Sequence, residues 1–366
     1  MTSQKKRVVV LGNGFSKAFI PGMPLVKDGF EVKPLLDKFN ETSSPGAFRI
    51  LKGAINSASD QKGCKVTDFE VLMTRLDNLM PYDFRHKVIQ ELKFLYEELK
   101  QLFVKQIKSA IDEGLKGKNG ELLNPINEFA KYCISNQIDC VTFNYDDLLN
   151  RALFKCGISS KTNICNPSWY PDGGYGFYCR PAHSLVLNET DYMDVTTMFL
   201  LKLHGSINWR IKMGASEILG PEDLVHKADW LEPPSHFEVT QTTQKMDELM
   251  ENHLKPEGFM VLPVLMKGDL KTQPIFRLIW GLAYEKLVQA DEVFIVGYSL
   301  PNSDIAARFL FKETLSHKQC ISVVNWAVED KDKESIKSNY RDVFPWLSDK
   351  NFNFKRAKAW CSDFIK

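Results

Sequence analysis

The chain has 366 residues, and its 47 lysines and arginines nearly balance its 46 aspartates and glutamates, so the formal net charge is +1. With 44% hydrophobic and 25% charged residues, the composition is that of a globular protein and excludes a disordered chain, which needs low hydrophobicity and a large net charge. The charge balance gives no general attraction to phosphate backbones or anionic membranes. We therefore expect no direct binding to nucleic acid.

The cysteines and the start of the chain set the expected compartment. No two of the eight cysteines form a C-x-x-C pair, so neither a zinc ribbon nor a redox dithiol is indicated. The apolar run after MTSQKKR is too short for a signal peptide. No eighteen apolar residues run together, as a membrane-spanning helix would need. We expect a cytoplasmic protein with reduced cysteines.

Six short apolar runs rich in valine and isoleucine predict buried parallel strands. They are Arg7–Leu11, Ile138–Phe143, Met198–Leu203, Gly258–Leu262, Glu292–Val296 and Cys320–Asn325. Five of the six lead directly into a polar or glycine-rich segment. In open α/β sheets, ligands bind beyond the carboxyl ends of the strands, so the chemistry is expected there. The pattern predicts an α/β protein with a Rossmann-like parallel sheet.

A long amphipathic helix is predicted between the first two strands, over Phe84–Leu115. Its apolar residues recur in steps of four and three from Val88 to Leu102, and charged residues fill the opposite side. Two interpretations remain open at this point. The helix packs on the body of its own domain, or it serves as a lid or a subunit interface.

The predicted domain organisation is one main domain with insertions. We expect the domain over residues 1–330, with a helical insertion at about 40–130 and irregular insertions at about 157–194 and 211–257. The last of these is polar and is expected to form peripheral helices and loops. Residues 331–366 form a C-terminal tail that alternates charged and aromatic residues.

The tail and the amphipathic helix together predict association between copies of the chain. The aromatic residues of the tail are Phe344, Trp346, Phe352, Phe354 and Trp360. With the helix they offer more apolar side chain than one sheet face requires, and large exposed apolar patches usually mark association surfaces. We therefore expect a homo-oligomer. The alternative is that both segments pack on the Rossmann body.

The segment Gly12-Asn13-Gly14-Phe15-Ser16 follows the first strand and should open a helix. Glycines there let a phosphate approach the backbone, and a helix N-terminus supplies N–H donors. The third glycine of the dinucleotide fingerprint is missing, so a tight turn between strand and helix is the alternative.

Candidate catalytic side chains follow the next two strands. Asn144 ends a strand, where its amide can hold a water or a ribose hydroxyl. Asp146 or Asp147 could instead cap the following helix. Among the seven histidines we favour His204 as the general base, because it directly follows an apolar strand. His183 is its one rival, and the other five, including His226, are expected at the surface.

The last two predicted strands end in further polar groups. Gly297, Tyr298 and Ser299 suit a phosphate or a ribose, and Asn325 could bond a second ribose.

In chain order, GNGFS, TFNYDD, KLHGSINW, VGYSLPNSD and VVN resemble the motifs of the sirtuin-like superfamily, and specifically its bacterial branch. The resemblance spans residues 12 to 325, while 40–130 and 211–257 match no motif. It implies a sirtuin-like fold that uses NAD as its substrate. Protein-deacylating sirtuins carry two C-x-x-C zinc pairs after the His-Gly, whereas here only Cys320 and Cys361 follow His204. The chain therefore looks like the zinc-free, NAD-consuming members found in bacterial antiphage systems.

Roles for individual residues follow from this resemblance. Asn144 would position the water or the nicotinamide ribose, Asp146 would stabilise the nicotinamide end, and His204 would take a proton from water or from a ribose hydroxyl. Gly12, Gly14, Ser16 and Ser299 would hold the pyrophosphate and Asn325 the adenosine ribose, with Asn13, Phe15, Gly297 and Tyr298 completing the two NAD-binding loops. No metal is expected. A bound metal would point to Cys156, Cys165, Cys179 and His183.

The resemblance implies an NAD glycohydrolase that releases ADP-ribose and nicotinamide and acts in antiphage defence by depleting NAD. The alternatives are an NAD-dependent protein deacylase or ADP-ribosyltransferase, and a non-catalytic module that binds NAD or ADP-ribose. Because uncontrolled NAD hydrolysis would kill the host, we expect control by assembly or by a partner. By resemblance, the partner is a HerA-like ring ATPase or an Argonaute-like protein.

Overall fold

A computed structural model describes most of the chain. The described residues are 5–24, 30–55, 65–66, 69–78, 80–83, 85–116, 124–159, 168–180, 182, 198–228, 230, 251–261, 269–316 and 320–366. They fall into two compact units. The first comprises Met1–Pro21, Leu115–Met260 and Asp269–Lys366, and the second comprises Gly22–Gly114 and Val261–Gly268.

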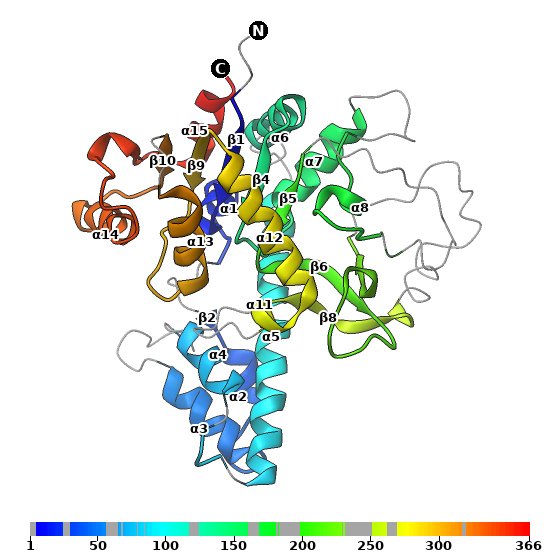
Figure 1. Cartoon of the computed structure of the whole chain (residues 1–366). Helices are drawn as coiled ribbons and strands as arrows, with labels where there is room; N and C mark the ends of the chain where they lie inside the picture. The colour runs from blue at the N-terminus through cyan, green and yellow to red at the C-terminus, as the bar shows by residue number, and fades with distance from the viewer. Residues whose placement is uncertain are drawn as a thin grey trace. The chain divides into compact units, whose positions relative to one another are not determined.

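A six-stranded sheet with the order β11-β10-β9-β1-β4-β5 forms the centre of the first unit (Figure 1). All of its pairings are parallel. The strands are β1 (Arg7–Leu11), β4 (Asp139–Thr142), β5 (Leu200–Lys202), β9 (Glu292–Val296), β10 (Ile321–Val324) and β11 (Phe352–Asn353). The predicted α/β class with a Rossmann-like parallel sheet is confirmed, and five of the six predicted strands lie in this sheet.

The prediction that Gly258–Leu262 is a parallel strand of the central sheet is wrong in both partner and direction. Residues 254–260 form β8 (Leu254–Met260), which pairs antiparallel with β6 (Gly205–Lys212) in a separate sheet completed by β7 (Leu224–His226). The expectation of helices and loops over 211–257 is wrong where its described part forms β7 and part of β8, and is confirmed for the loop at 213–220 and the 3-10 helix Pro221–Asp223. Pro256 and Gly258 lie inside β8, and its register against β6 is irregular. Such residues weaken a strand signal in the sequence.

Helices cover the central sheet in two groups. The first group comprises α1 (Asn13–Phe19), α6 (Asn124–Asn136) and α15 (Ala357–Phe364). Phe129 joins its members, with ring centroids 5.8 Å from Phe15 and 5.9 Å from Trp360. The second group comprises α12 (Pro274–Gln289) and α13 (Ile305–Leu315), and α12 crosses in front of the strands in Figure 1. The other α-helices that the structure describes in this unit are α7 (Leu148–Ser159), α14 (Asp330–Arg341) and the short α8 (Pro171–Gly174) and α11 (Asp269–Thr272).

The C-terminal tail is part of the first unit. It supplies α14, the edge strand β11 and α15. Phe344 is fully buried and Trp360 is 6% exposed, whereas Trp346 is 41% exposed. Phe352 and Phe354 are half-buried. Two of the five aromatic residues that suggested association are therefore buried inside the unit, as the alternative interpretation expected. The homo-oligomer remains a prediction without that support.

The second unit is built around α5 (His86–Leu115), the predicted amphipathic helix. Leu92, Leu95 and Leu99 of the predicted apolar stripe are fully buried. Phe103, one position beyond the stripe, contacts the rings of Phe30 and Phe69 within the same unit, so this face of α5 serves the unit's own core. The other elements are β2 (Phe30–Glu31), β3 (Lys65–Val66), α2 (Lys33–Lys38), α3 (Pro45–Ala54) and α4 (Phe69–Asp77).

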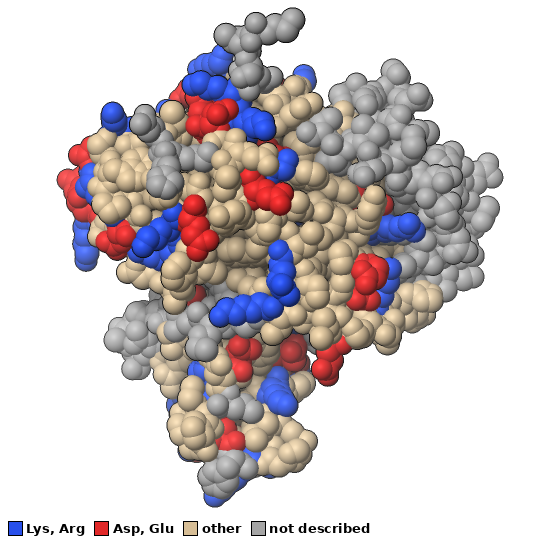
Figure 2. Space-filling model, viewed as in Figure 1, with Lys and Arg blue, Asp and Glu red and all other residues tan. Residues whose placement is uncertain are grey.

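The surface shows no segregation of charge on the face drawn in Figure 2, where acidic and basic side chains are interspersed. Among the helices that the structure describes, none combines the length and the apolar character needed to cross a membrane.

Candidate active site

The loops after β1 and β9 touch each other at the carboxyl edge of the central sheet. The Gly12 amide donates to the Val296 carbonyl at 3.0 Å, and the Gly14 amide donates to the Gly297 carbonyl at 2.9 Å. A Cβ on Gly12 would lie 2.5 Å from the Cα of Tyr298. Gly297 has a φ of +69°, and a Cβ there would lie 2.1 Å from the Phe15 nitrogen. The contact between the loops therefore requires glycines at these positions.

This packing explains the GNG sequence without a phosphate. The Gly14 and Phe15 amides donate to Gly297 and Gly12, so two donors expected to face a pyrophosphate serve the fold instead. The tight-turn alternative is sufficient to account for these glycines. Pyrophosphate binding by Gly12, Gly14 and their neighbours stays a prediction.

Asn144 links this loop to the end of β4. Its side-chain amide nitrogen donates to the Gly12 carbonyl and to the Ser16 hydroxyl, each at 3.0 Å. The residue is 6% exposed. Its Oδ1 is buried and has no hydrogen-bond partner among the described residues. Because a buried unsatisfied acceptor costs about 1–3 kcal/mol, this oxygen is suited to a hydroxyl or a water brought by a ligand.

The two aspartates after Asn144 have structural partners. Asp146 accepts a hydrogen bond from the Leu148 amide at 3.1 Å, at the start of α7, so the capping alternative holds for its side chain. Burial raises the pKa of Asp146, opposed by the charge of Lys202 and by a hydrogen bond from Ser16. Burial therefore favours the neutral, protonated form of the Asp146 carboxyl over the charged form.

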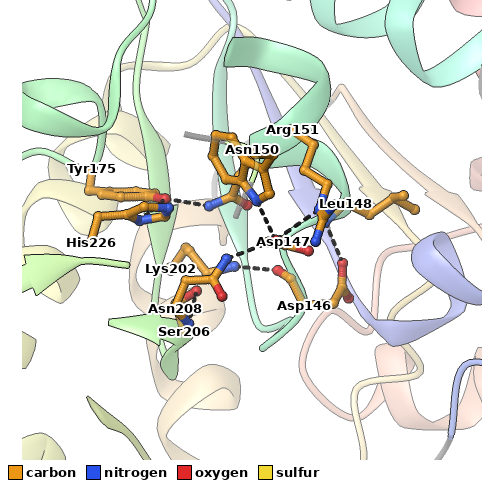
Figure 3. A network of polar contacts seen from close by, with 11 residues as sticks. Asp146, Asp147, Leu148, Asn150, Arg151, Tyr175, Lys202, Ser206, Asn208 and His226 are labelled. Carbon is orange, nitrogen blue, oxygen red and sulfur yellow. Dashed lines mark hydrogen bonds and ion pairs between the residues drawn. The ribbon is translucent and has the colours of Figure 1, made fainter. Parts of the chain in front are cut away.

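Asp147 is the centre of a buried polar network (Figure 3). Its Oδ2 accepts from Arg151 Nε at 3.0 Å, from Asn208 Nδ2 at 2.7 Å and from Trp230 Nε1 at 2.6 Å. Lys202 Nζ donates to the Asp146 carbonyl at 2.7 Å, and burial lowers the pKa of Lys202 to about 8. The network fixes the segment that carries Asn144 and Asp146. A lysine inside the apolar run of β5 was the sequence signal for it.

His226 belongs to the same region and is fully buried, so its predicted surface position is wrong. Its Nδ1 lies 3.0 Å from the hydroxyl of Tyr175, which also accepts from Asn150 Nδ2. Burial lowers the pKa of His226 to about 3. This histidine is therefore neutral near pH 7 and has a structural role. His226 is buried because it lies in β7, and this strand has only three residues, too few to be predicted from the sequence.

His204 lies in the turn between β5 and β6 and is 5% exposed. Its ring meets Phe143 edge-on at 5.3 Å and lies near Tyr145 and Trp280, at 6.0 and 6.4 Å between centroids. Its Nε2 lies 4.0 Å from Oδ2 of Asp304. The aromatic side chains exclude bulk water from the His204 ring. A general base in a desolvated site needs such surroundings.

Asp304 was not among the residues predicted from the sequence. It immediately precedes α13, where an aspartate ordinarily predicts a helix cap, but its carboxylate makes no capping hydrogen bond. Instead its Oδ2 accepts from the hydroxyl of Tyr298 at 2.7 Å. The ring of Tyr298 stacks on Phe143, with centroids 4.3 Å apart and 6° between the planes.

The loop that carries Tyr298 and Ser299 is held by three side chains. Asn325 Nδ2 and the Tyr340 hydroxyl donate to the Tyr298 carbonyl at 3.0 and 2.8 Å, and Asn339 Nδ2 donates to the Ser299 carbonyl at 3.1 Å. The amide donor of Asn325 is thus engaged within the fold. A ribose contact by Asn325 and phosphate contacts by Ser299 remain predictions.

The structure brings Asn144 and His204 to the carboxyl ends of the neighbouring strands β4 and β5, together with the loops after β1 and β9. His183 and Cys165 lie outside the described residues. Within the described ranges, no three histidine, cysteine, aspartate or glutamate side chains gather as a metal site would require.

No protein-family model and no curated protein sequence matches the chain. Among solved structures, the chain is similar to one described as the structural basis for the mechanism and regulation of Sir2 enzymes, with 12% identity, a TM-score of 0.40, and coverage of 99% of this chain and 91% of that one. It is also similar to Sir2Tm bound to a propionylated peptide, with 11% identity, a TM-score of 0.40, and coverage of 99% and 93%.

Proposed function

We propose that the chain is an NAD glycohydrolase, which splits NAD and water into ADP-ribose and nicotinamide. The observation that carries the proposal is the buried Oδ1 of Asn144, without a partner among the described residues, on the same edge of the sheet as the buried ring of His204. An acceptor for a hydroxyl and a base in an apolar environment are the two groups that this reaction needs. The order of the sequence motifs supports the same proposal.

The proposed reaction is a substitution at the anomeric carbon of the nicotinamide ribose. The carbon–nitrogen bond breaks, its electron pair leaves with the nicotinamide, and a water oxygen bonds to the same carbon. Asn144 accepts a hydrogen bond from the water or a ribose hydroxyl through Oδ1, because its nitrogen is already held by Gly12 and Ser16. His204 takes the proton that the water or the hydroxyl loses.

Purified protein incubated with NAD tests this proposal, with nicotinamide and ADP-ribose separated by chromatography. We expect both products in equal amounts without any added peptide. A dependence on an acyl-lysine peptide, with transfer of the acyl group to ADP-ribose, would favour a deacylase instead. ADP-ribose attached to protein would favour an ADP-ribosyltransferase. Binding of NAD with no product would leave a binding module.

We also propose the cellular role that the motif resemblance implies, which is depletion of NAD in bacteria infected by phage. Control would come from assembly or from a partner such as a HerA-like ring ATPase or an Argonaute-like protein. Infected cells should lose NAD when they carry the chain and keep it when they carry His204→Ala. We propose that no metal takes part, so elemental analysis should find no stoichiometric zinc.

A further inference from the structure

We propose that Asp304, held by the hydroxyl of Tyr298, is a positioning residue that orients His204 and stabilises its protonated form. Its effect on NAD cleavage rests on the proposed function, whereas its effect on the His204 ring does not.

The geometry gives Asp304 two neighbours with defined roles. Its Oδ2 accepts from the Tyr298 hydroxyl at 2.7 Å and faces His204 Nε2 at 4.0 Å. All three residues are buried, with exposures of 5% for Asp304, 7% for Tyr298 and 5% for His204. Capping of α13 does not account for the carboxylate, because it makes no capping bond.

Tyr298 is itself firmly placed. Its ring stacks on Phe143 at 4.3 Å and meets Phe311 of α13 edge-on at 6.2 Å, while its carbonyl is held by Asn325 and Tyr340. The hydroxyl therefore has little freedom to leave Asp304. Tyr298, which was expected to bind NAD, therefore also holds the carboxylate of Asp304 beside His204.

The electrostatic consequence follows from burial. An imidazolium in an apolar environment is costly unless an opposite charge lies close to it. A carboxylate facing one ring nitrogen favours a proton on that nitrogen, so the other nitrogen is the one that can accept a proton from a substrate. Asp304 would thereby set both the tautomer and the stability of the cation that forms.

The described ring contacts of His204 are aromatic. The ring contacts come from Phe143 and Tyr145 after β4 and from Trp280 of α12. Of these three side chains, Tyr145 alone titrates, and tyrosine phenols ordinarily ionise near pH 10. Among these named contacts, Asp304 is the one that carries a carboxyl group.

Asp304→Asn tests the proposal, because it removes the charge and keeps the size of the side chain. Proton NMR of the His204 ring, assigned with His204→Ala, should show its titration midpoint at lower pH in Asp304→Asn by about one unit. Asp304→Glu, which keeps the charge, should recover part of this difference. Asp342→Asn is the matched control, since Asp342 pairs with Arg308 of α13 at 3.6 Å and is 54% exposed. It should leave the midpoint unchanged.

A double-mutant cycle tests the catalytic consequence. Asp304→Asn should lower kcat about 10–100-fold in the wild-type background and have little further effect in His204→Ala, because it acts through that ring. An unchanged midpoint in Asp304→Asn, or an equal loss of activity in both backgrounds, would overturn the proposal. If wild type does not cleave NAD, the proposed function fails, and the NMR titration still decides whether Asp304 acts on His204.

Discussion

Gly12 and Gly297 allow two loops to touch, and this requirement can be measured separately from ligand binding. Gly12→Ala should lower the free energy of unfolding by about 1–3 kcal/mol, because the new Cβ meets backbone atoms of Gly297 and Tyr298. Gly281→Ala is the control, since Gly281 lies inside α12 with nothing within 4 Å of an added Cβ. It should raise stability by up to about 1 kcal/mol. Urea denaturation measures both, and a fully stable Gly12→Ala that fails only to bind NAD would indicate phosphate contact instead.

His226 should make the protein less stable in acid. Its pKa in the folded protein is about 3, below the ordinary value of 6.5, so the unfolded chain takes up a proton that the folded protein does not. Stability is therefore complete above pH 6.5 and falls as the pH drops toward 3. Between pH 7.5 and 5, the loss from this group is about 2 kcal/mol.

His226→Asn removes the titrating ring while keeping an acceptor for Tyr175, and His253→Asn is the control at an exposed position. Denaturant unfolding at the two pH values should show a smaller acid loss in His226→Asn than in wild type and an unchanged loss in His253→Asn. Equal acid losses in all three proteins would contradict the buried, neutral state of His226.

The sequence predicted the positions of Asn144 and His204, because polar residues after apolar strands are visible as a local pattern. The same local pattern did not predict the roles of Asp304 and Lys202. Asp304 lies where an aspartate ordinarily caps a helix, but it accepts from Tyr298, six residues before it, and faces His204, which is distant in the chain. Lys202 lies within an apolar run, where its carbonyl acceptor on Asp146 depends on the pairing of β4 with β5.

At the scale of elements, the parallel strands were predictable because they are short, apolar and buried on both faces. The antiparallel sheet of β6, β7 and β8 was not, because β7 has only three residues and β8 contains proline and glycine. The edge strand β11 has two residues and gives no periodic signal. Its place in the sheet depends on pairing with β10.

The last helix should be essential to the first unit. Trp360 of α15 is 6% exposed and contacts Phe129 of α6 and Phe294 of β9. Trp360→Ala should therefore lower the free energy of unfolding by about 3–5 kcal/mol. Trp346→Ala is the control, since Trp346 is 41% exposed, and it should change stability by less than about 1 kcal/mol. Similar losses in the two variants would contradict the role of α15.

At the scale of the whole molecule, the homo-oligomer remains a prediction, and an exposed apolar surface on α13 now supports it in place of the aromatic tail. Ile305 and Phe309 lie one turn apart on α13 and are 57% and 58% exposed. Light scattering should give a multiple of the 41.9 kDa chain mass, and Phe309→Glu should lower it. Met213→Glu is the control, because Met213 is 59% exposed after β6. A wild-type mass near that of one chain would end the oligomer prediction.

The measurement that tests the central claim most directly is the rate of nicotinamide release from NAD by wild type, His204→Ala and Asn144→Ala under the same conditions. The wild-type protein should release nicotinamide and ADP-ribose, and each variant should fold normally and turn over about 10²–10⁴-fold more slowly. Turnover by His204→Ala at the wild-type rate would contradict the assignment of the base and direct attention to His183. Absence of nicotinamide release by the wild-type protein, alone and with candidate partners, would contradict the proposed activity itself.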